Sequence, residues 1–277
     1  MTPPTPNTAA PEEPPLNGLD VRFLGVRVHK LTWGRLIDAV AESVEKDRRW
    51  IIANHNLHSV YLYHHDAAVR AFYGRADIVH IDGMSLVLFG KLLGLRLSRL
   101  NRLTPLDWIR PLMAEAARRR WRIFYLGSAP GIAARGADIL RREFPGLLLE
   151  VADGYFDVRE DGVENQNVVA GINRYRPHLL LVGMGMPRQE RWILENAERV
   201  HTNAIFNVGA LMDYIAGAVP TPPRWLGPLG LEWLFRLLCQ PAHLWKRYLI
   251  ESWFVCGLFL TELAARGRAA GDQARRK

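Results

Sequence analysis

The residues best suited to chemistry stand where predicted strands end. Asp82 follows the apolar run "DIVHI" and precedes Gly83, a residue type that lets a ligand approach the backbone closely. A carboxylate in this place can accept the proton of an attacking hydroxyl, as a general base does. The alternative is that Asp82 only caps a helix that begins near Ser85. We favour the catalytic interpretation.

A second polar group ends the segment "IIANHNLHS", in which Asn54 and Asn56 flank a histidine. One of these residues can cap the following helix, because asparagine accepts hydrogen bonds from free backbone N–H groups. Capping does not account for the whole group, so we also consider it for the site. The histidines His58, His64 and His65 are expected on a helix surface and not as ligands.

A glycine turn joins strand to helix in "WRIFYLGSAPGIAARGADIL". Gly127 and Ser128 would direct free N–H groups and a helix N-terminus toward a phosphate. The stretch lacks a complete dinucleotide-binding fingerprint and a P-loop lysine, so it supports neither a dehydrogenase nor a kinase. Further along, Tyr155 offers an aromatic face for a base and Asp213 an acceptor for a ribose, although both also suit ordinary turns.

The stretch "LLLVGMGMPRQERWILENA" passes from a buried strand into a charged helix. Gly183 and Gly185 end the strand, and Pro187 suits a first helical turn. Glu190 in that turn would interact favourably with the helix dipole, whereas Gln189 gains nothing comparable. Because Glu190 would repel a bare phosphate, we expect an uncharged hydroxylated ligand here, such as a ribose or another sugar.

Short apolar runs alternate with helical patterns along most of the chain, which predicts the elements that position these residues. The alternation indicates a Rossmann-like α/β sandwich with a largely parallel sheet over residues 18–217. In such sheets the ligand lies beyond the carboxyl ends of the strands. The predicted strands are 21–28, 49–56, 76–82, 121–128, 146–156, 178–185 and 202–210, and the predicted helices are 32–47, 56–74, 105–120, 131–144 and 189–200.

The two ends of the chain differ from this pattern. Residues 1–17 are rich in proline, lack the features of a signal peptide and are predicted to be a disordered tail. Residues 218–277 form a predicted helical appendage that is basic and aromatic, with nine Lys/Arg against four acids from residue 224 onward, a net charge of +5. Two cysteines match no disulfide framework or metal site and favour a cytoplasmic setting.

Tryptophan beside Arg and Lys in the appendage suits the headgroup level of a membrane. The alternative is a helical hairpin packed on the core, with Trp225 and Trp233 buried. No uninterrupted run of about 20 apolar residues exists, so a transmembrane helix is not expected. The nearest segment, "YLIESWFVCGLFLTELAA", contains Glu251 and Glu262 and is predicted to be amphipathic.

Taken in order, these motifs resemble those of the WecG/TagA/CpsF glycosyltransferase family, also called glycosyltransferase family twenty-six. The resemblance covers residues 20–250 and is carried by "ANHN", "IDGMSLV", "RLTPLDW", "FYLGSAPG", "DGYF", "GMGMPRQE", "NVGALMDYIAGAVPTPPRW" and "GLEWLFRLLCQPAHLWKRY". It implies inverting transfer of a hexose, of the N-acetylmannosamine or glucose type, from a UDP-sugar to a polyprenyl-diphosphate-linked saccharide in cell-surface or exopolysaccharide synthesis. It also implies a peripheral position on the cytoplasmic membrane face, and relatives suggest homo-oligomers.

The resemblance assigns roles by position. Asp82 matches the family's proposed base and Asn56 the polar residue that orders the site. Gln189 and Glu190 match its nucleotide-sugar contacts, and the appendage arginines match the segment thought to reach the membrane and bind the lipid diphosphate. Our own hypothesis is that Arg224 or Arg236 also stabilises the departing UDP. No Asp-x-Asp motif occurs, so neither a metal nor a cofactor is implied. The expected catalytic residues are Asp82, Asn56, Arg224 and Arg236, and the expected substrate-binding residues are Asn54, Gly83, Thr104, Asp107, Gly127, Ser128, Tyr155, Gly183, Gly185, Gln189, Glu190, Asp213 and Arg247.

Two departures leave the sugar open. Where relatives often have Thr-x-Asn, this chain has Asn54 and Asn56, and where they often have R-x-T-G-x-D it has Pro105 in place of glycine. A UDP-sugar epimerase or dehydrogenase is the rival enzyme, disfavoured by the missing dinucleotide fingerprint and Tyr-x-x-x-Lys pair. A nucleic-acid-binding module is the non-enzyme rival suggested by the net charge of +8. It is disfavoured because the positive charge gathers beside tryptophans in the tail, and we expect no nucleic-acid partner.

Overall fold

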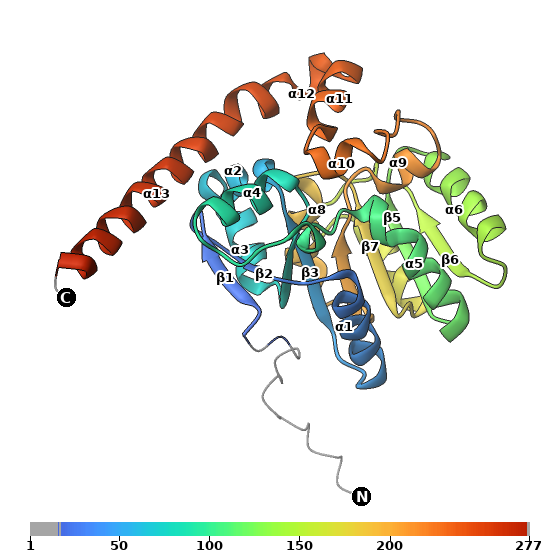
Figure 1. The fold of residues 1–277 in the computed structure, drawn as a ribbon. Coiled ribbons are helices and arrows are strands. Elements are labelled where there is room, and N and C mark those ends of the chain that lie inside the picture. Colours follow the sequence, from blue (N-terminus) through green and yellow to red (C-terminus); the bar gives the residue numbers. More distant parts are fainter. Residues whose placement is uncertain (1–15, 17, 276–277) are drawn as a thin grey trace, which may run out of the picture.

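A six-stranded parallel sheet forms the centre of the molecule in a computed structural model that describes Leu16 and residues 18–275 (Figure 1). The strand order is β4-β3-β8-β7-β5-β6, so the chain builds one edge, crosses to the other and fills the middle last. This confirms the predicted α/β class. The strands are β3 (Trp50–His55), β4 (Ile78–Ile81), β5 (Arg122–Gly127), β6 (Leu148–Ala152), β7 (Leu179–Gly183) and β8 (Ala204–Asn207).

Helices cover both faces because successive strand residues point to opposite sides of the sheet. In β7, for example, Leu180 and Val182 belong to one core cluster and Leu179 and Leu181 to the other. One face carries α1 (Trp33–Glu45), α5 (Pro105–Arg119), α6 (Ile132–Glu143) and α9 (Leu211–Ile215), and the other carries α2 (Leu57–His65), α3 (Ala67–Arg75), α4 (Met84–Leu92), α7 (Val163–Tyr175) and α8 (Arg188–Asn196).

Two predicted elements differ from the structure. The predicted strand 21–28 is an antiparallel hairpin, β1 (Asp20–Phe23) and β2 (Val26–His29), outside the central sheet. Its turn places Leu24 and Gly25 at φ of 52° and 75°, the left-handed conformation of a tight hairpin turn. The predicted helix 56–74 is two helices, because the Asp66 carboxylate accepts hydrogen bonds from the backbone N–H groups of the following turn and starts a new helix there.

The C-terminal appendage lies over the carboxyl ends of the strands (Figure 1). It comprises α10 (Leu226–Leu229), α11 (Glu232–Cys239), α12 (Pro241–Lys246), a π-helical turn η2 (Arg247–Glu251) and α13 (Ser252–Arg275). The helix α13 packs on the body and then extends past it, with Phe259 stacked on Phe89 at 4.6 Å between ring centroids. The Glu262 carboxylate accepts a hydrogen bond of 2.6 Å from the backbone N–H of Leu24.

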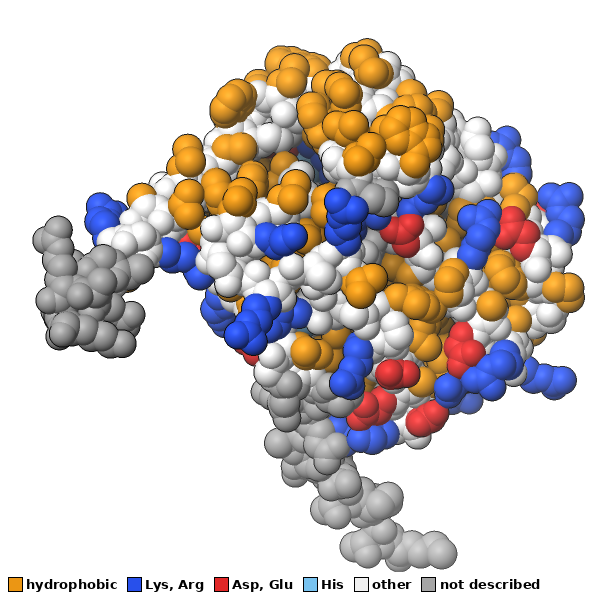
Figure 2. All heavy atoms as spheres, in the orientation of Figure 1, with side chains coloured by type: hydrophobic (Ala, Val, Ile, Leu, Met, Phe, Trp, Pro, Cys, Tyr) orange, Lys and Arg blue, Asp and Glu red, His pale blue; other side chains and the backbone are white. Residues whose placement is uncertain are grey.

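The tryptophans of the appendage are not buried as a packed hairpin would require. Trp225 is 66% exposed and Trp233 is 38% exposed. Figure 2 shows hydrophobic side chains gathered over the appendage and along α13. The predicted disordered tail lies outside the described residues except for Leu16, which is buried in the core.

Candidate active site

A cavity of about 860 Å³ lies between the carboxyl ends of the strands and the appendage. A second cavity of about 120 Å³ lies beside it, and Asp82 lines both. The predicted site residues that line the large cavity are Asn54, Asn56, Asp82, Thr104, Ser128, Tyr155, Gly183, Gly185, Gln189, Asp213, Arg236 and Arg247. Gly83 lines the smaller one.

Asp82 is held beside Asn56 at the ends of β4 and β3. The Asn56 side chain caps α2 by accepting a hydrogen bond from the Ser59 N–H at 3.1 Å, and its Nδ2 donates to Asp82 Oδ2 at 3.2 Å. The helix after Asp82 begins with Gly83 as its cap residue and has no side-chain cap. Capping therefore does not explain Asp82, whose Oδ1 has no hydrogen-bond partner among the described residues.

A buried network of amides fixes the body side of the large cavity. Asn54 Nδ2 donates to the Asn207 carbonyl at 2.8 Å, and Asn207 Nδ2 donates to Glu190 Oε1 at 2.9 Å. Gln189 Nε2 donates to the same Glu190 oxygen at 2.8 Å, while its Oε1 accepts from the Gly209 N–H at 3.1 Å. The orientation of each amide is thus set by its neighbour before any ligand binds.

Glu190 lies behind Gln189, and of the two only Gln189 lines the cavity. Burial raises the pKa of Glu190 to about 7, although the amides of Asn207 and Gln189 lower it somewhat. Its Oε2 is buried without a hydrogen-bond partner in the part of the chain that the structure describes. The expected repulsion of a phosphate by Glu190 does not follow from this position, because the carboxyl group faces amides instead of the cavity.

Two of the predicted ligand-binding glycines are required by backbone packing. A Cβ atom on Gly127 would lie 2.2 Å from the Gly183 carbonyl oxygen, and one on Gly183 would lie 2.2 Å from the Tyr125 hydroxyl. Gly185 differs, since it has φ of +78° and no atom near its would-be Cβ. Gly127 and Gly183 therefore allow strands β5 and β7 to approach each other closely.

Ser128 and Asp213 meet at the far end of the large cavity. Ser128 Oγ donates to Asp213 Oδ2 at 3.0 Å and lies 2.9 Å from the Tyr125 hydroxyl. Tyr155 stands at the rim and is 74% exposed. Arg188, which the sequence interpretation did not single out, also lines this end and donates to the carbonyls of Gly154 and Phe156 at 2.9 and 2.6 Å.

Arg236 and Arg247 bring positive charge from the appendage to both cavities. Each guanidinium lies over an aromatic ring, at 5.7 Å from the ring centroids of Tyr214 and Tyr248 respectively. Within the described residues, the Nε atoms of both arginines are buried without hydrogen-bond partners. Both guanidinium groups thus have unused donors in the cavities that Asp82 also lines. Such donors suit an anionic ligand.

Arg224 and Asp107 do not line either cavity and contact each other instead. Arg102 donates to Asp107 at 2.9 Å and pairs with Glu232 at 2.7 Å, and Arg224 lies 3.6 Å from the same Glu232 oxygen. This network joins the appendage to the start of α5. The expected direct roles of Arg224 in catalysis and of Asp107 in substrate binding thus have no support in their positions, because each charge already has a partner.

His58 and Glu251 are two cavity residues that sequence reasoning missed. Their side chains are in hydrogen-bond contact between α2 and the π-helical turn η2, and both line the large cavity. His58 was expected on a helix surface, which is correct for α2 alone. The appendage covers that surface in the folded protein. Glu251 follows His58 by nearly two hundred residues in the sequence, so no local pattern predicts this contact.

Comparison with known proteins identifies the family. Residues 21–269 match the model of the glycosyl transferase WecG/TagA/CpsF family. The chain belongs to this family. It is also 29% identical over 192 residues to the N-acetylglucosaminyldiphosphoundecaprenol N-acetyl-beta-D-mannosaminyltransferase of Bacillus spizizenii, an alignment that covers 69% of this chain and 71% of the relative. The protein is therefore a glycosyltransferase.

Proposed function

We propose that this glycosyltransferase moves a hexose, of the N-acetylmannosamine or glucose type, from a UDP-sugar to a saccharide linked to polyprenyl diphosphate, with inversion at the anomeric carbon. The observation that carries the proposal is the place of Asp82, between two cavities and with a carboxylate oxygen that lacks a protein partner. The name of the Bacillus relative supports the class of acceptor.

In the proposed reaction Asp82 takes the proton of an acceptor hydroxyl, and the resulting oxygen attacks the anomeric carbon of the donor. The bond from that carbon to the diphosphate oxygen breaks, and its electron pair leaves with UDP. Asn56 orients the base through its hydrogen bond to Asp82. Arg236 and Arg247 stabilise the departing charge with donors that are already in place.

This arrangement uses guanidinium groups in place of a metal ion, so we propose metal-independent transfer. Within residues 18–275 as described, no group of three or more His, Cys, Asp or Glu side chains is placed to hold a metal ion. The buried amides and the Ser128 turn face the larger cavity, which has room for a nucleotide-sugar. We assign the UDP-sugar to this cavity on that basis.

We further propose that the appendage binds an anionic membrane surface from the cytoplasmic side. The helix Leu244–Ala269 is long and apolar enough to cross a membrane by length and composition alone. However, Glu251 and Glu262 within it bond to His58 and to the Leu24 N–H, which ties this helix to the body at two points. A helix docked in this way lies on a membrane more readily than it crosses one.

Calorimetric titration with UDP, in buffer with and without EDTA, tests the donor assignment. We expect binding that EDTA does not change. Tyr155→Ala should weaken it, because this exposed side chain contributes an aromatic face at the rim, and Val163→Ala should not, since Val163 is equally exposed but outside the cavity. Transfer from a panel of UDP-sugars to a lipid-linked acceptor then identifies the sugar. A wild-type protein that binds no UDP and transfers no sugar, with or without anionic vesicles, would refute the proposal.

A further inference from the structure

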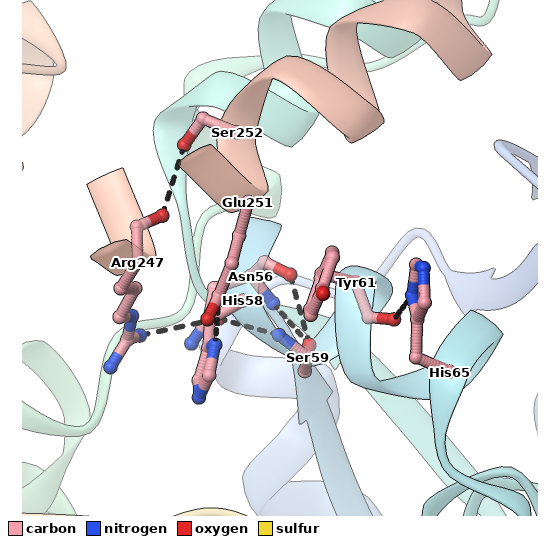
Figure 3. Close-up of polar contacts among 8 residues, drawn as sticks. All are labelled: Asn56, His58, Ser59, Tyr61, His65, Arg247, Glu251 and Ser252. Atoms are coloured by element: carbon pink, nitrogen blue, oxygen red, sulfur yellow. Dashed lines mark hydrogen bonds and ion pairs between the residues drawn. The ribbon is translucent and has the colours of Figure 1, made fainter. Parts of the chain in front are cut away.

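The His58–Glu251 pair is a carboxylate–imidazole contact inside the candidate site. His58 Nδ1 contacts Glu251 Oε2, and the two side chains are only 15% and 18% exposed (Figure 3). His58 lies in the first turn of α2, two residues after Asn56, and Glu251 ends the π-helical turn of the appendage. Single π-helical turns often mark functional positions.

The contact decides which histidine nitrogen carries the proton. A carboxylate only accepts hydrogen bonds, so Nδ1 must be the N–H and Nε2 must carry the lone pair. Burial lowers the pKa of His58, Arg247 and Arg236 lower it further, and Glu251 raises it. The imidazole is therefore neutral near pH 7, and Nε2 is an acceptor with no hydrogen-bond partner among the described residues.

His58 lines both cavities, as Asp82 and Asn56 do. The smaller cavity has Met84, Trp233 and Tyr248 on one side, and the charged residues Glu232, Arg236 and Arg247 also line it. Trp233 and Tyr248 thus place aromatic side chains beside the polar groups of Asp82 and His58, where the face of a sugar ring can pack. The larger cavity is assigned to the donor, so the acceptor approaches Asp82 from this aromatic side.

We infer that His58, oriented by Glu251, binds the acceptor sugar by accepting a hydrogen bond from one of its hydroxyl groups and so positions the attacking hydroxyl at Asp82. This inference rests on the proposed function and adds an acceptor-binding residue to it. It also gives the appendage a second role in the site, because Glu251 reaches His58 only when the appendage is docked on α2.

Steady-state kinetics with varied acceptor tests the inference. His58→Phe keeps an aromatic ring and removes both nitrogens, and we expect kcat/KM for the acceptor to fall about tenfold, the usual effect of one neutral hydrogen bond. The affinity for UDP should stay within about twofold of wild type. Glu251→Ala should lower kcat/KM for the acceptor similarly, whereas Glu251→Gln, which retains an accepting oxygen, should recover most of it.

Two matched controls separate this role from a structural one. His65→Phe alters an exposed histidine of the same helix, whose Nδ1 hydrogen-bonds to the Tyr61 carbonyl of its own helix, as Figure 3 shows. Glu262→Gln alters another appendage acid that contacts the body away from the cavities. Both should leave the acceptor kinetics unchanged. Nitrogen chemical shifts of His58 should report the Nδ1–H form in wild type and its loss in Glu251→Ala.

The inference is overturned if His58→Phe retains wild-type kinetics for the acceptor. It is also overturned if the substitution lowers UDP affinity and thermal stability as strongly as acceptor use, because His58 would then only support the fold. A wild-type enzyme that transfers no sugar from any UDP-sugar would instead refute the proposed function, so the two failures are distinguishable.

Discussion

The two walls of the large cavity are built in opposite ways. On the body wall, the buried amides of Asn54, Gln189 and Asn207 each have a hydrogen-bond partner and surround Glu190, of which only Oε2 has none among the described residues. On the appendage wall, Arg236 and Arg247 keep buried Nε atoms for which the described residues offer no acceptor. A satisfied network holds a fixed shape, whereas unused donors in a closed site favour a ligand that supplies acceptors. We therefore expect the body to determine the shape of the cavity, and the arginines of the appendage to pair with the ligand when it binds.

The tryptophans repeat this contrast. Trp108 and Trp192 of the body are each 1% exposed, whereas Trp225 and Trp253 of the appendage are 66% and 75% exposed. The burial of Trp108 and Trp192 is explained by the folding of this chain. The second pair leaves aromatic side chains exposed to water, which supports the membrane contact that we propose for the appendage.

Asp82→Asn should have the largest effect of any single change at the boundary between the walls. The amide keeps the size of the side chain but cannot accept the proton, and general-base catalysis contributes about 10²- to 10⁴-fold. We expect kcat to fall within that range while UDP affinity stays near wild type, as measured by transfer assays and calorimetry. A variant that retains wild-type kcat would show that another group is the base.

Glu190 tests whether the body wall depends on a neutral carboxyl group. Its pKa is raised from 4.5 to about 7 in the folded protein, so the folded state holds the proton more tightly than the unfolded state. The stability that this provides is complete below pH 4.5 and is lost as the pH rises through about 7. The shift corresponds to a loss of up to about 3 kcal/mol in the free energy of unfolding.

Glu190→Gln mimics the protonated side chain at every pH. The free energy of unfolding of wild type relative to this variant should therefore decrease between pH 5 and pH 8, as measured from urea midpoints. Glu115→Gln serves as a control, because Glu115 is paired with Arg118 at the surface and has a lowered pKa. A difference that stays constant over this pH range would mean that Glu190 is already ionised in the folded protein.

The body wall was largely predictable from local sequence patterns, whereas on the appendage wall Arg236 and Arg247 were expected only from the family resemblance and the contact of Glu251 was not expected. Strand–helix alternation placed Asp82, Asn56 and Gln189 at strand ends, and parallel strands bring such ends to one edge. Local patterns did not reveal that Glu190 of α8 turns inward, because its partner Asn207 lies on a different element, strand β8. The same reason hid the contact of Glu251, since the appendage reaches α2 only through the folded structure.

The exposed tryptophans of the appendage should contribute to membrane binding. Trp225→Ala and Trp253→Ala each remove an aromatic side chain whose burial contributes roughly 1.5 to 3 kcal/mol. We expect each substitution to weaken binding to anionic vesicles about tenfold in sedimentation assays, without a change in thermal stability. Leu148→Ala on the body, which also removes an exposed apolar side chain, should have no effect. Unchanged vesicle binding in both tryptophan variants would favour a contact with a second protein chain.

The smallest effect on kcat/KM is expected for substitutions in the surface ion network that joins the appendage to the body. Arg224 is paired with Asp107 and lies outside both cavities, and pairs this exposed contribute about 0.2 to 1 kcal/mol. Arg224→Ala should therefore lower kcat/KM by less than about fivefold, whereas Arg236→Ala removes a donor inside the cavity and should lower it more than about tenfold. Equal losses in the two variants would mean that the ion network opens during catalysis and that Arg224 moves into the site. The appendage would then act as a moving part, and the fixed geometry would belong to the body alone.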